Sequence, residues 1–189
     1  MTIQLSPVSA ASAGASGSTP IPASAPQGDL PTSSEGFAFL DGHWRVANRR
    51  LKEPLSGRRE WTEFDTSARF FSLLHGLVSV EELRDAGGKP FGGAMRTFDR
   101  QRRTWSDAWV SARDGVLQPP VHGRFEGNIG TWTAQDTHEG QPILVRGIWR
   151  RVSAKEVIWE QAASLDGGKS WETNWHMRFL RVADTAKVP

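Results

Sequence analysis

The sequence from residue 130 to residue 164 reads GTWTAQDTHEGQPILVRGIWRRVSAKEVIWEQAAS. Residues 130–136, 143–152 and 156–164 form three runs rich in β-branched and aromatic residues, each of the length of a strand. His138-Glu-Gly140 lies between the first two runs, and its glycine tolerates the positive φ angles of a hairpin turn. The stretch therefore predicts consecutive antiparallel strands joined by short turns.

The same alternation of strand-like runs and turn residues continues on both sides of this stretch. Further turns are predicted at segments rich in Gly, Asn and Asp, such as Asp85-Ala-Gly-Gly-Lys-Pro90 and Asp166-Gly-Gly-Lys169. The predicted strands are 44–51, 60–64, 67–74, 77–83, 93–99, 104–110, 121–126, 130–136, 143–152, 156–164 and 171–182.

Sequential hairpins without a convincing long helix indicate an all-β antiparallel protein of up-and-down topology. One sheet of this many strands would expose long edges unless it closed on itself. We therefore predict a closed β-barrel of about eight to ten strands, with space inside for side chains and one small ligand. Residues 35–43 are expected to form a short helix or turn that leads into the barrel.

The composition of the chain changes near residue 35. Residues 1–34 are rich in Ser, Ala, Pro and Gly and contain few large apolar side chains, so we predict a disordered N-terminal tail. The barrel is predicted over residues 35–183, and residues 184–189 are predicted to be a C-terminal tail.

The composition also excludes several classes of function. The absence of cysteine excludes disulfides, thiolate catalysis and cysteine-ligated metals. A net charge of +2, with short arginine clusters beside acidic residues, does not indicate nucleic-acid binding. Neither a secretory signal nor an apolar run long enough to span a membrane is evident. We therefore expect a cytoplasmic protein.

Several segments carry a resemblance to known proteins. Phe39-Leu-Asp-Gly-His-Trp-Arg45 resembles the Leu-x-Gly-x-Trp opening of many lipocalin-like proteins. Four further segments resemble a bacterial family of lipocalin-like domains of unknown function. They are Met95-Arg-Thr-Phe-Asp99, Thr104-Trp-Ser-Asp-Ala-Trp109, Pro119-Pro-Val-His-Gly-Arg-Phe-Glu126 and, most specifically, Trp159-Glu-Gln-Ala-Ala-Ser-Leu-Asp-Gly-Gly-Lys-Ser-Trp-Glu-Thr-Asn-Trp175. The resemblance covers residues 37–182 and implies a calycin-type, lipocalin-like barrel. It implies no particular reaction, since fold alone does not establish function.

Strand alternation places some polar side chains among apolar neighbours. Arg96 shares a face with Ala94 and Phe98, whereas Arg146 shares one with Leu144 and Ile148. Buried arginines require acceptors, so one interpretation is an internal ion-pair network with Asp107, Glu160 or Glu172. The other interpretation is a ligand cavity in which Arg96 and Arg146 hold a carboxylate or carbonyl. The candidate ligand-binding residues are Arg96, Trp109, Arg146, Gln161, Trp175 and His176.

Catalytic residues are harder to assign, because the sequence contains no nucleophile elbow and no phosphate or dinucleotide loop. The candidates for a general acid or base are His75, His122 and Glu160. No histidine spacing indicates a metal site, and we expect neither metal nor cofactor. His176, on the last strand, is the residue at which we would look for a haem ligand, because related haem-binding barrels use a late histidine.

These observations favour a protein that binds a small, largely apolar or aromatic metabolite inside its barrel, with arginine side chains orienting the polar end of the ligand. A cofactor-free isomerase, cyclase, hydratase or lyase with a general acid or base in the same cavity is the main alternative. A haem-binding barrel and a fully packed interaction module are further alternatives. The expected partner is a small molecule, neither nucleic acid nor membrane is expected, and a homodimer is left open.

Overall fold

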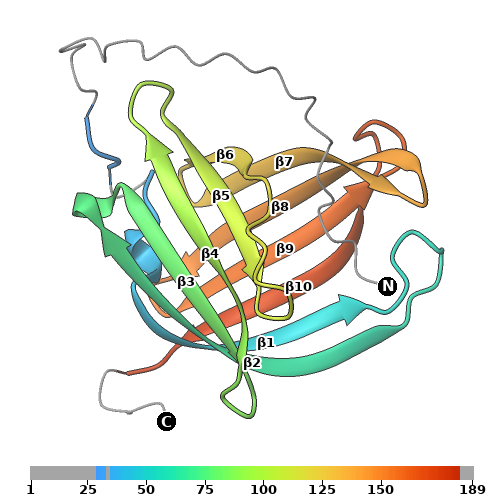
Figure 1. Cartoon of the computed structure of the whole chain (residues 1–189), viewed down its shortest axis with the longest axis horizontal. Coiled ribbons are helices and arrows are strands. Elements are labelled where there is room, and N and C mark those ends of the chain that lie inside the picture. Colours follow the sequence, from blue (N-terminus) through green and yellow to red (C-terminus); the bar gives the residue numbers. More distant parts are fainter. Residues whose placement is uncertain (1–28, 33–34, 184–189) are drawn as a thin grey trace.

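Ten antiparallel strands close into one barrel in the computed structural model, which describes residues 29–32 and 35–183 (Figure 1). Every strand pairs with its neighbours in sequence, and β1 also pairs with β10, which closes the sheet. The strands are β1 (Gly42–Leu51), β2 (Trp61–Leu73), β3 (Val78–Asp85), β4 (Pro90–Asp99), β5 (Thr104–Ser111), β6 (Val121–Glu126), β7 (Ile129–His138), β8 (Gln141–Ser153), β9 (Glu156–Ser164) and β10 (Glu172–Arg181). The predicted all-β, up-and-down barrel is confirmed, and it is compatible with a lipocalin-like fold.

The structure has one strand fewer than the eleven predicted, because the predicted strands 60–64 and 67–74 are a single strand, β2. The predicted break lay at Asp65 and Thr66, and of these two residues only Asp65 belongs to a type that is depleted in strands. In the structure β1 pairs with β2 without interruption, and Thr66 lies directly opposite Val46. The Thr66 hydroxyl also accepts a hydrogen bond from Asn48 Nδ2 at 3.0 Å inside the barrel. Continuous pairing with a ten-residue partner therefore carries the ladder through these two residues.

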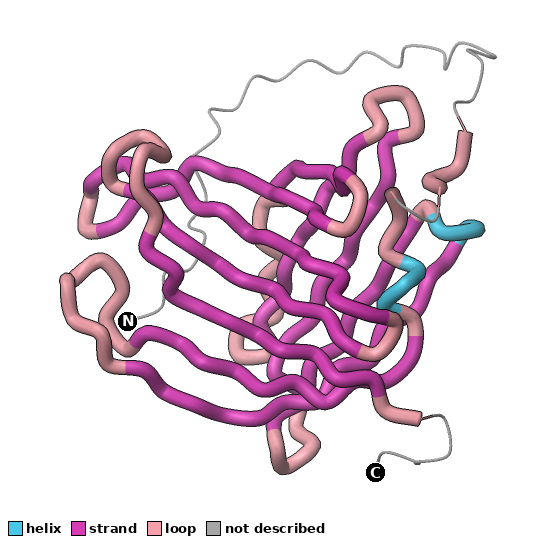
Figure 2. Tube along the Cα trace, turned by 180° about the vertical axis from the view of Figure 1, so that it is seen from behind, coloured by secondary structure: helices cyan, strands magenta, loops and turns pink. Residues whose placement is uncertain are grey.

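One end of the barrel is closed by the segment that precedes β1. This segment contains the short 3-10 helix η1 (Ala38–Leu40), and the second short helix, η2 (Leu74–Gly76), lies at the same end (Figure 2). Phe37 inserts its ring into the barrel, 4.9 Å from the centroid of Trp105 and 5.0 Å from that of Phe125, both edge to face. The indole of Trp44 donates a hydrogen bond to the Leu40 carbonyl at 2.6 Å. Packed aromatic side chains therefore close this end of the barrel, which we call the base.

Two arginines hold the closing segment in place. Arg103, in the turn between β4 and β5, forms an ion pair with Glu35 and donates to the Asp29 carbonyl at 2.9 Å. Arg151 donates to the Gly36 carbonyl at 2.8 Å. Residues 29–32, which belong to the predicted tail, thus lie against the barrel. Residues 1–28 and 33–34 of that tail, and the predicted C-terminal tail 184–189, lie outside the described residues.

Replacing Glu35 by glutamine is expected to lower the free energy of unfolding by about 1 kcal/mol at pH 7. Hydrogen bonds from Arg103 and then from Thr32 lower the pKa of the Glu35 carboxyl from 4.5 to about 2. A carboxyl whose pKa is lower in the folded state stabilises the protein above its unfolded pKa, and that contribution is lost as the pH falls through the folded value. The difference between wild type and variant should therefore disappear between pH 4.5 and about pH 2.

Urea unfolding of both proteins at several pH values measures this difference. Glu63→Gln is the matched control, because Glu63 forms an ion pair with Arg49 at 3.0 Å but its side chain is 71% exposed. The control should change stability by less than about 0.5 kcal/mol. A loss for Glu35→Gln that persists unchanged at about pH 2 would contradict the assigned role of the ion pair.

Candidate functional site

A cavity of about 550 Å³ lies inside the barrel, between the aromatic base and the opposite end. That opposite end carries five connections between strands: residues 52–60, 86–89, 112–120, 139–140 and 165–171. The volume falls within the range of roughly 300–1,000 Å³ that is typical of small-molecule pockets. The barrel is therefore not filled by its own side chains.

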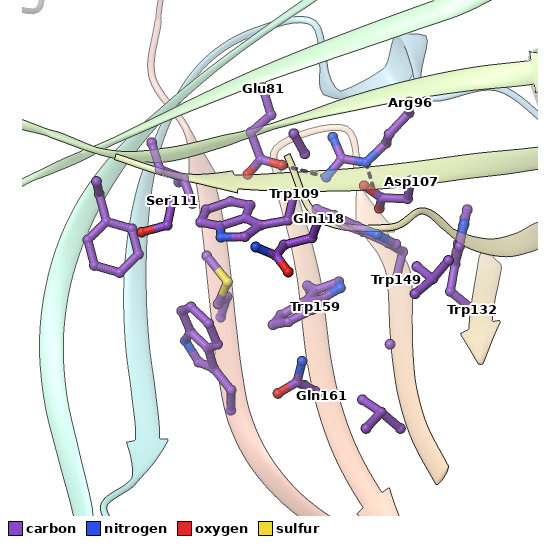
Figure 3. A pocket seen from close by; sticks show the side chains of 18 of the residues that line it. Glu81, Arg96, Asp107, Trp109, Ser111, Gln118, Trp132, Trp149, Trp159 and Gln161 are labelled. Carbon is purple, nitrogen blue, oxygen red and sulfur yellow. Dashed lines mark hydrogen bonds and ion pairs between the residues drawn. The ribbon is translucent and has the colours of Figure 1, made fainter. Parts of the chain in front are cut away.

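Seven aromatic side chains line the cavity, four of which are labelled in Figure 3. Trp159 and Trp175 pack edge to face, with ring centroids 5.6 Å apart, and Phe91 contacts both Trp109 and Trp175 at 6.5 Å. These contacts hold the rings in fixed orientations and leave flat apolar surface facing the cavity. The aromatic lining residues are Phe91, Trp109, Trp132, Trp149, Trp159, Trp175 and Phe179.

Two carboxylates and one guanidinium form a buried cluster at the base of the cavity, which we call the acid–arginine cluster (Glu81, Arg96 and Asp107). Arg96 donates from Nη2 to Glu81 at 2.5 Å and from Nε to Asp107 at 2.9 Å (Figure 3). The register explains the meeting: Arg96 on β4 lies directly opposite Asp107 on β5, and Glu81 on β3 is its diagonal neighbour. The pleat turns all three side chains inward.

Burial determines the electrostatics of this cluster. The side chains of Arg96 and Glu81 are only 3% and 4% exposed, whereas that of Asp107 is 16% exposed. Burial raises the pKa of the Glu81 carboxyl, although the adjacent Arg96 opposes the shift. Burial also disfavours the charge on Arg96, but Asp107 and Glu81 outweigh this and hold its pKa above the usual value. The guanidinium therefore stays charged, and its charge is neutralised locally.

Two of the three Arg96 nitrogens, Nη2 and Nε, are engaged by the carboxylates. Its third nitrogen, Nη1, is buried and has no hydrogen-bond partner within the described structure. The guanidinium carbon lies 4.9 Å from the ring centroid of Phe37 and 5.3 Å from that of Trp149. The guanidinium is thus held between carboxylates and aromatic faces, where cation–π attraction partly replaces the missing hydrogen bond.

A second arginine lies at the open end of the cavity. Arg50 follows Val46 and Asn48 on the inward face of β1 and lines the cavity one residue before that strand ends. Its guanidinium carbon lies 4.5 Å from the ring centroid of Trp175, and burial lowers its pKa. No carboxylate of the described residues lies within ion-pair distance of Arg50, so its donors face the cavity without an internal acceptor.

Two glutamines add neutral polar groups to the lining. Gln161 lies on the inward face of β9, opposite Trp175. Gln118 comes from the connection between β5 and β6. This connection folds back so that the backbone N–H of Gln118 donates to the Trp109 carbonyl at 2.7 Å. Both side chains point into the cavity (Figure 3), where each amide can donate and accept hydrogen bonds.

Four of the six predicted ligand-binding residues are brought together by the fold. Arg96, Trp109, Gln161 and Trp175 all line the cavity, although they come from four different strands. Asp107, one of the carboxylates suggested as a partner for a buried arginine, does pair with Arg96.

The other two predicted ligand-binding residues lie on the outer surface of the barrel. Arg146 was predicted to face inward with Leu144 and Ile148, but the inward residues of β8 are Val145, Gly147 and Trp149. Arg146 instead stacks on Trp171, 4.2 Å from the ring centroid. This corrects its predicted position: the guanidinium of Arg146 stacks on an indole ring outside the barrel.

His176 is also displaced from its predicted position. It lies opposite Arg49 on β1 and Glu160 on β9, on the outer face, whereas Trp175 and Met177 on either side of it line the cavity. All five histidines are in the described part of the chain, and none of them lines the cavity. The position expected for a haem ligand is therefore outside the barrel.

The catalytic candidates lie outside the cavity as well. His75 is in η2 at a φ of 55°, on the exposed surface at the closed end. His122 is on the outer face of β6, with Nδ1 3.2 Å from the Ser106 hydroxyl. Glu160 is on the outer face of β9 and pairs with Arg150 at 3.4 Å. Alternation along β6 and β9 places His122 and Glu160 on the face opposite to the lining residues, and His75 lies beyond the closed end. None of the three is therefore positioned to act on a molecule in the cavity.

The sequence reasoning missed Glu81, Arg50 and Gln118. Glu81 was hidden because Val78 and Val80 made the other face of β3 look like the buried one. Arg50 could have been found by extending the alternation that starts at the buried Trp44, which places it on the inward face. Gln118 could not have been found, because it lies in a connection whose path depends on tertiary contacts.

Comparison with known proteins adds no assignment to these features. No model of a known protein family matches the chain, and no curated protein matches it significantly. Among the described residues, no group of three or more His, Asp or Glu side chains is arranged to hold a metal ion. Nor does that part of the chain contain a helix that is long and apolar enough to cross a membrane.

Proposed function

We propose that this protein binds a small, largely apolar or aromatic molecule inside its barrel. The cavity of about 550 Å³ with seven aromatic side chains in its wall carries the proposal. Planar aromatic rings bury large areas and stack on a planar ligand at little cost in conformational entropy. A barrel that served only as a packed scaffold would fill this volume with its own side chains.

The arginine that orients the polar end of this ligand is Arg50. It lines the cavity, lies against Trp175 and has no carboxylate within ion-pair distance among the described residues, whereas Arg96 already pairs with Glu81 and Asp107. A half-buried guanidinium without a carboxylate partner favours an anionic or carbonyl group of the ligand beside it.

Filling the cavity is expected to abolish binding. Ala134 lines the cavity, so Ala134→Phe places a ring where the ligand would lie. Isothermal titration calorimetry should show that this variant binds 2-naphthol at least about tenfold more weakly than wild type does, because the added ring excludes the ligand. Ala47→Phe is the matched control, because Ala47 is on the exposed outer face of β1.

Native mass spectrometry of the freshly purified protein complements the titration, because a ligand that co-purifies with wild type should be missing from Ala134→Phe. The proposal fails if Ala134→Phe binds 2-naphthol as tightly as wild type does. It also fails if Ala47→Phe weakens binding to the same extent, since the probe would then occupy the outer surface.

A cofactor-free acid–base reaction is the second candidate function. It is favoured by the presence of Glu81 and Asp107 in the cavity, and by burial that raises the pKa of Glu81 toward the range useful for proton transfer. These carboxyls replace His75, His122 and Glu160 as candidates for the general acid or base. Turnover of a co-purified ligand that is lost in Asp107→Asn, with binding retained, would support this candidate over binding alone.

A further inference from the structure

The polar groups of the cavity are distributed unequally between its two ends. The acid–arginine cluster lies at the base, where Arg96 contacts the ring of Phe37 from the closing segment. Arg50 lies at the open end, beside the 52–60 connection. Among the described residues, Glu81 and Asp107 are the only carboxylates that line the cavity, and both belong to the base. A ligand therefore meets different chemistry at its two ends.

The base accepts hydrogen bonds and offers no free cation. Glu81 and Asp107 share one guanidinium, so no positive charge remains, whether Glu81 is protonated or not. Asp107 is the most exposed member of the cluster, and only its Oδ2 is engaged by Arg96. A ligand carboxylate placed there would face an acceptor of the same charge, whereas a hydroxyl or amine could donate to it.

The open end has the opposite character. Arg50 offers its donors to the cavity, and the ring of Trp175 behind it holds the guanidinium in position. Arg113 also lines this end, although its side chain is 75% exposed and lies 3.8 Å from Asp114. An anionic group can therefore pair with Arg50 while it stays close to solvent, which limits the cost of its desolvation.

We propose that the ligand is an aromatic molecule with a hydroxyl or amine at one end and an anionic group at the other. Its donor enters first and reaches Asp107, and its anionic group pairs with Arg50 at the open end. The aromatic body lies between them against Trp109, Trp159 and Trp175. This inference rests on the proposed binding function and adds the class and the direction of the ligand.

Three probes of the same naphthalene skeleton separate the two ends. They are 6-hydroxy-2-naphthoic acid, naphthalene-2,6-dicarboxylic acid and 2-naphthol, titrated calorimetrically into the full-length protein at neutral pH. Wild type is expected to bind the hydroxy acid at least about tenfold more tightly than the diacid, because the second carboxylate would face Asp107. It should also bind the hydroxy acid more tightly than 2-naphthol, because 2-naphthol has no anionic group to pair with Arg50.

Two variants assign these preferences to residues. In Asp107→Asn, the amide oxygen can still accept from Arg96 while the amide nitrogen can donate to a carboxylate, so the preference for the hydroxy acid over the diacid should fall to within about threefold. Arg50→Gln should weaken the hydroxy acid about tenfold and leave 2-naphthol within about twofold. Arg49→Gln is the matched control, since Arg49 faces outward and pairs with Glu63, and it should change neither affinity.

The outcomes distinguish this inference from the proposed function. If wild type binds none of the three probes, the proposed function is overturned and the inference falls with it. If the probes bind but the diacid equals or exceeds the hydroxy acid, the binding function stands and the direction of the ligand is overturned. The wild-type comparison and Arg50→Gln decide the matter even if Asp107→Asn folds poorly.

Discussion

Arg96→Met is expected to lower the free energy of unfolding by about 3–5 kcal/mol at neutral pH. The substitution keeps most of the side-chain volume but removes the only cation that contacts Glu81 and Asp107 in the cavity. Two carboxyls then remain inside the barrel with their charge uncompensated, which costs more than the ion pairs themselves contribute. Urea unfolding followed by tryptophan fluorescence measures the loss.

The loss should shrink as the pH falls. Burial already raises the pKa of Glu81 and Arg96 opposes this, so removing Arg96 raises the pKa of Glu81 further. A carboxyl whose pKa is higher in the folded state stabilises the protein fully below its unfolded pKa, and that contribution is lost as the pH rises through the folded value. The variant should therefore recover stability relative to wild type as the pH falls from neutral to about 4.

Two further variants test this explanation. Arg178→Met removes an ion pair with Glu156 at 2.7 Å. The Arg178 side chain is half exposed, so this control should lower stability far less than Arg96→Met does. Adding Glu81→Gln to Arg96→Met should restore part of the lost stability, because one buried charge is removed. A loss that grows toward acid pH, or a double variant less stable than Arg96→Met, would contradict the role given to the cluster.

Phe37→Ala is expected to cost about 3–5 kcal/mol, the range for deleting a buried phenylalanine ring. The Phe37 side chain is 1% exposed and contacts four aromatic rings from β5, β6, β7 and β8. It also lies 4.9 Å from the Arg96 guanidinium, so its loss leaves a void beneath the acid–arginine cluster. The side chains around a deleted core ring relax only partially, so much of this void should remain unfilled.

Thermal and urea unfolding of Phe37→Ala and Phe71→Ala provide a matched comparison. Phe71 is on the outer face of β2 and is 39% exposed, so removing its ring should cost about 1 kcal/mol or less. Equal losses for the two variants would mean that Phe37 does not act as the base of the barrel.

The two expected effects are physically connected. The ring of Phe37 lies against the Arg96 guanidinium, and Glu81 and Asp107 form ion pairs with it. A charged group is tolerated at this depth because two carboxylates pair with it and the rings of Phe37, Phe70 and Trp149 lie against it. The base of the cavity is therefore rigid, which suits a subsite that has to select one end of a ligand.

Strand positions could be predicted because they depend on local information. β7, β8 and β9 are rich in β-branched and aromatic residues, and Gly140 allows the turn between the first two. These signals lie within a few residues of one another, so a linear reading captures them. The missed continuity of β2 is the exception, because uninterrupted pairing with β1 carries the strand through Asp65, a residue type that is depleted in strands.

Face assignment was less successful, and β10 illustrates the reason. Thr173 and Trp175 were placed on one face, but a register shift between them leaves Thr173 opposite Ala162 and Trp175 opposite Gln161. Ala162 and Gln161 point to opposite faces of β9, so the bulge reverses the alternation. Trp175 lines the cavity, whereas Trp171 at the start of the predicted strand stacks under Arg146 on the outside.

The sequence by itself determined an all-β antiparallel barrel with a wall rich in tryptophan and phenylalanine, because period-two alternation and turn residues are properties of short segments. Only the tertiary structure decided that Arg96 points inward and Arg146 outward. Alternation creates two faces without stating which is buried, and a charged side chain can enter the barrel only where partners meet it. The partner that settles this for Arg96 is Glu81, fifteen residues away on β3, and the register between β3 and β4 places the two diagonally opposite each other.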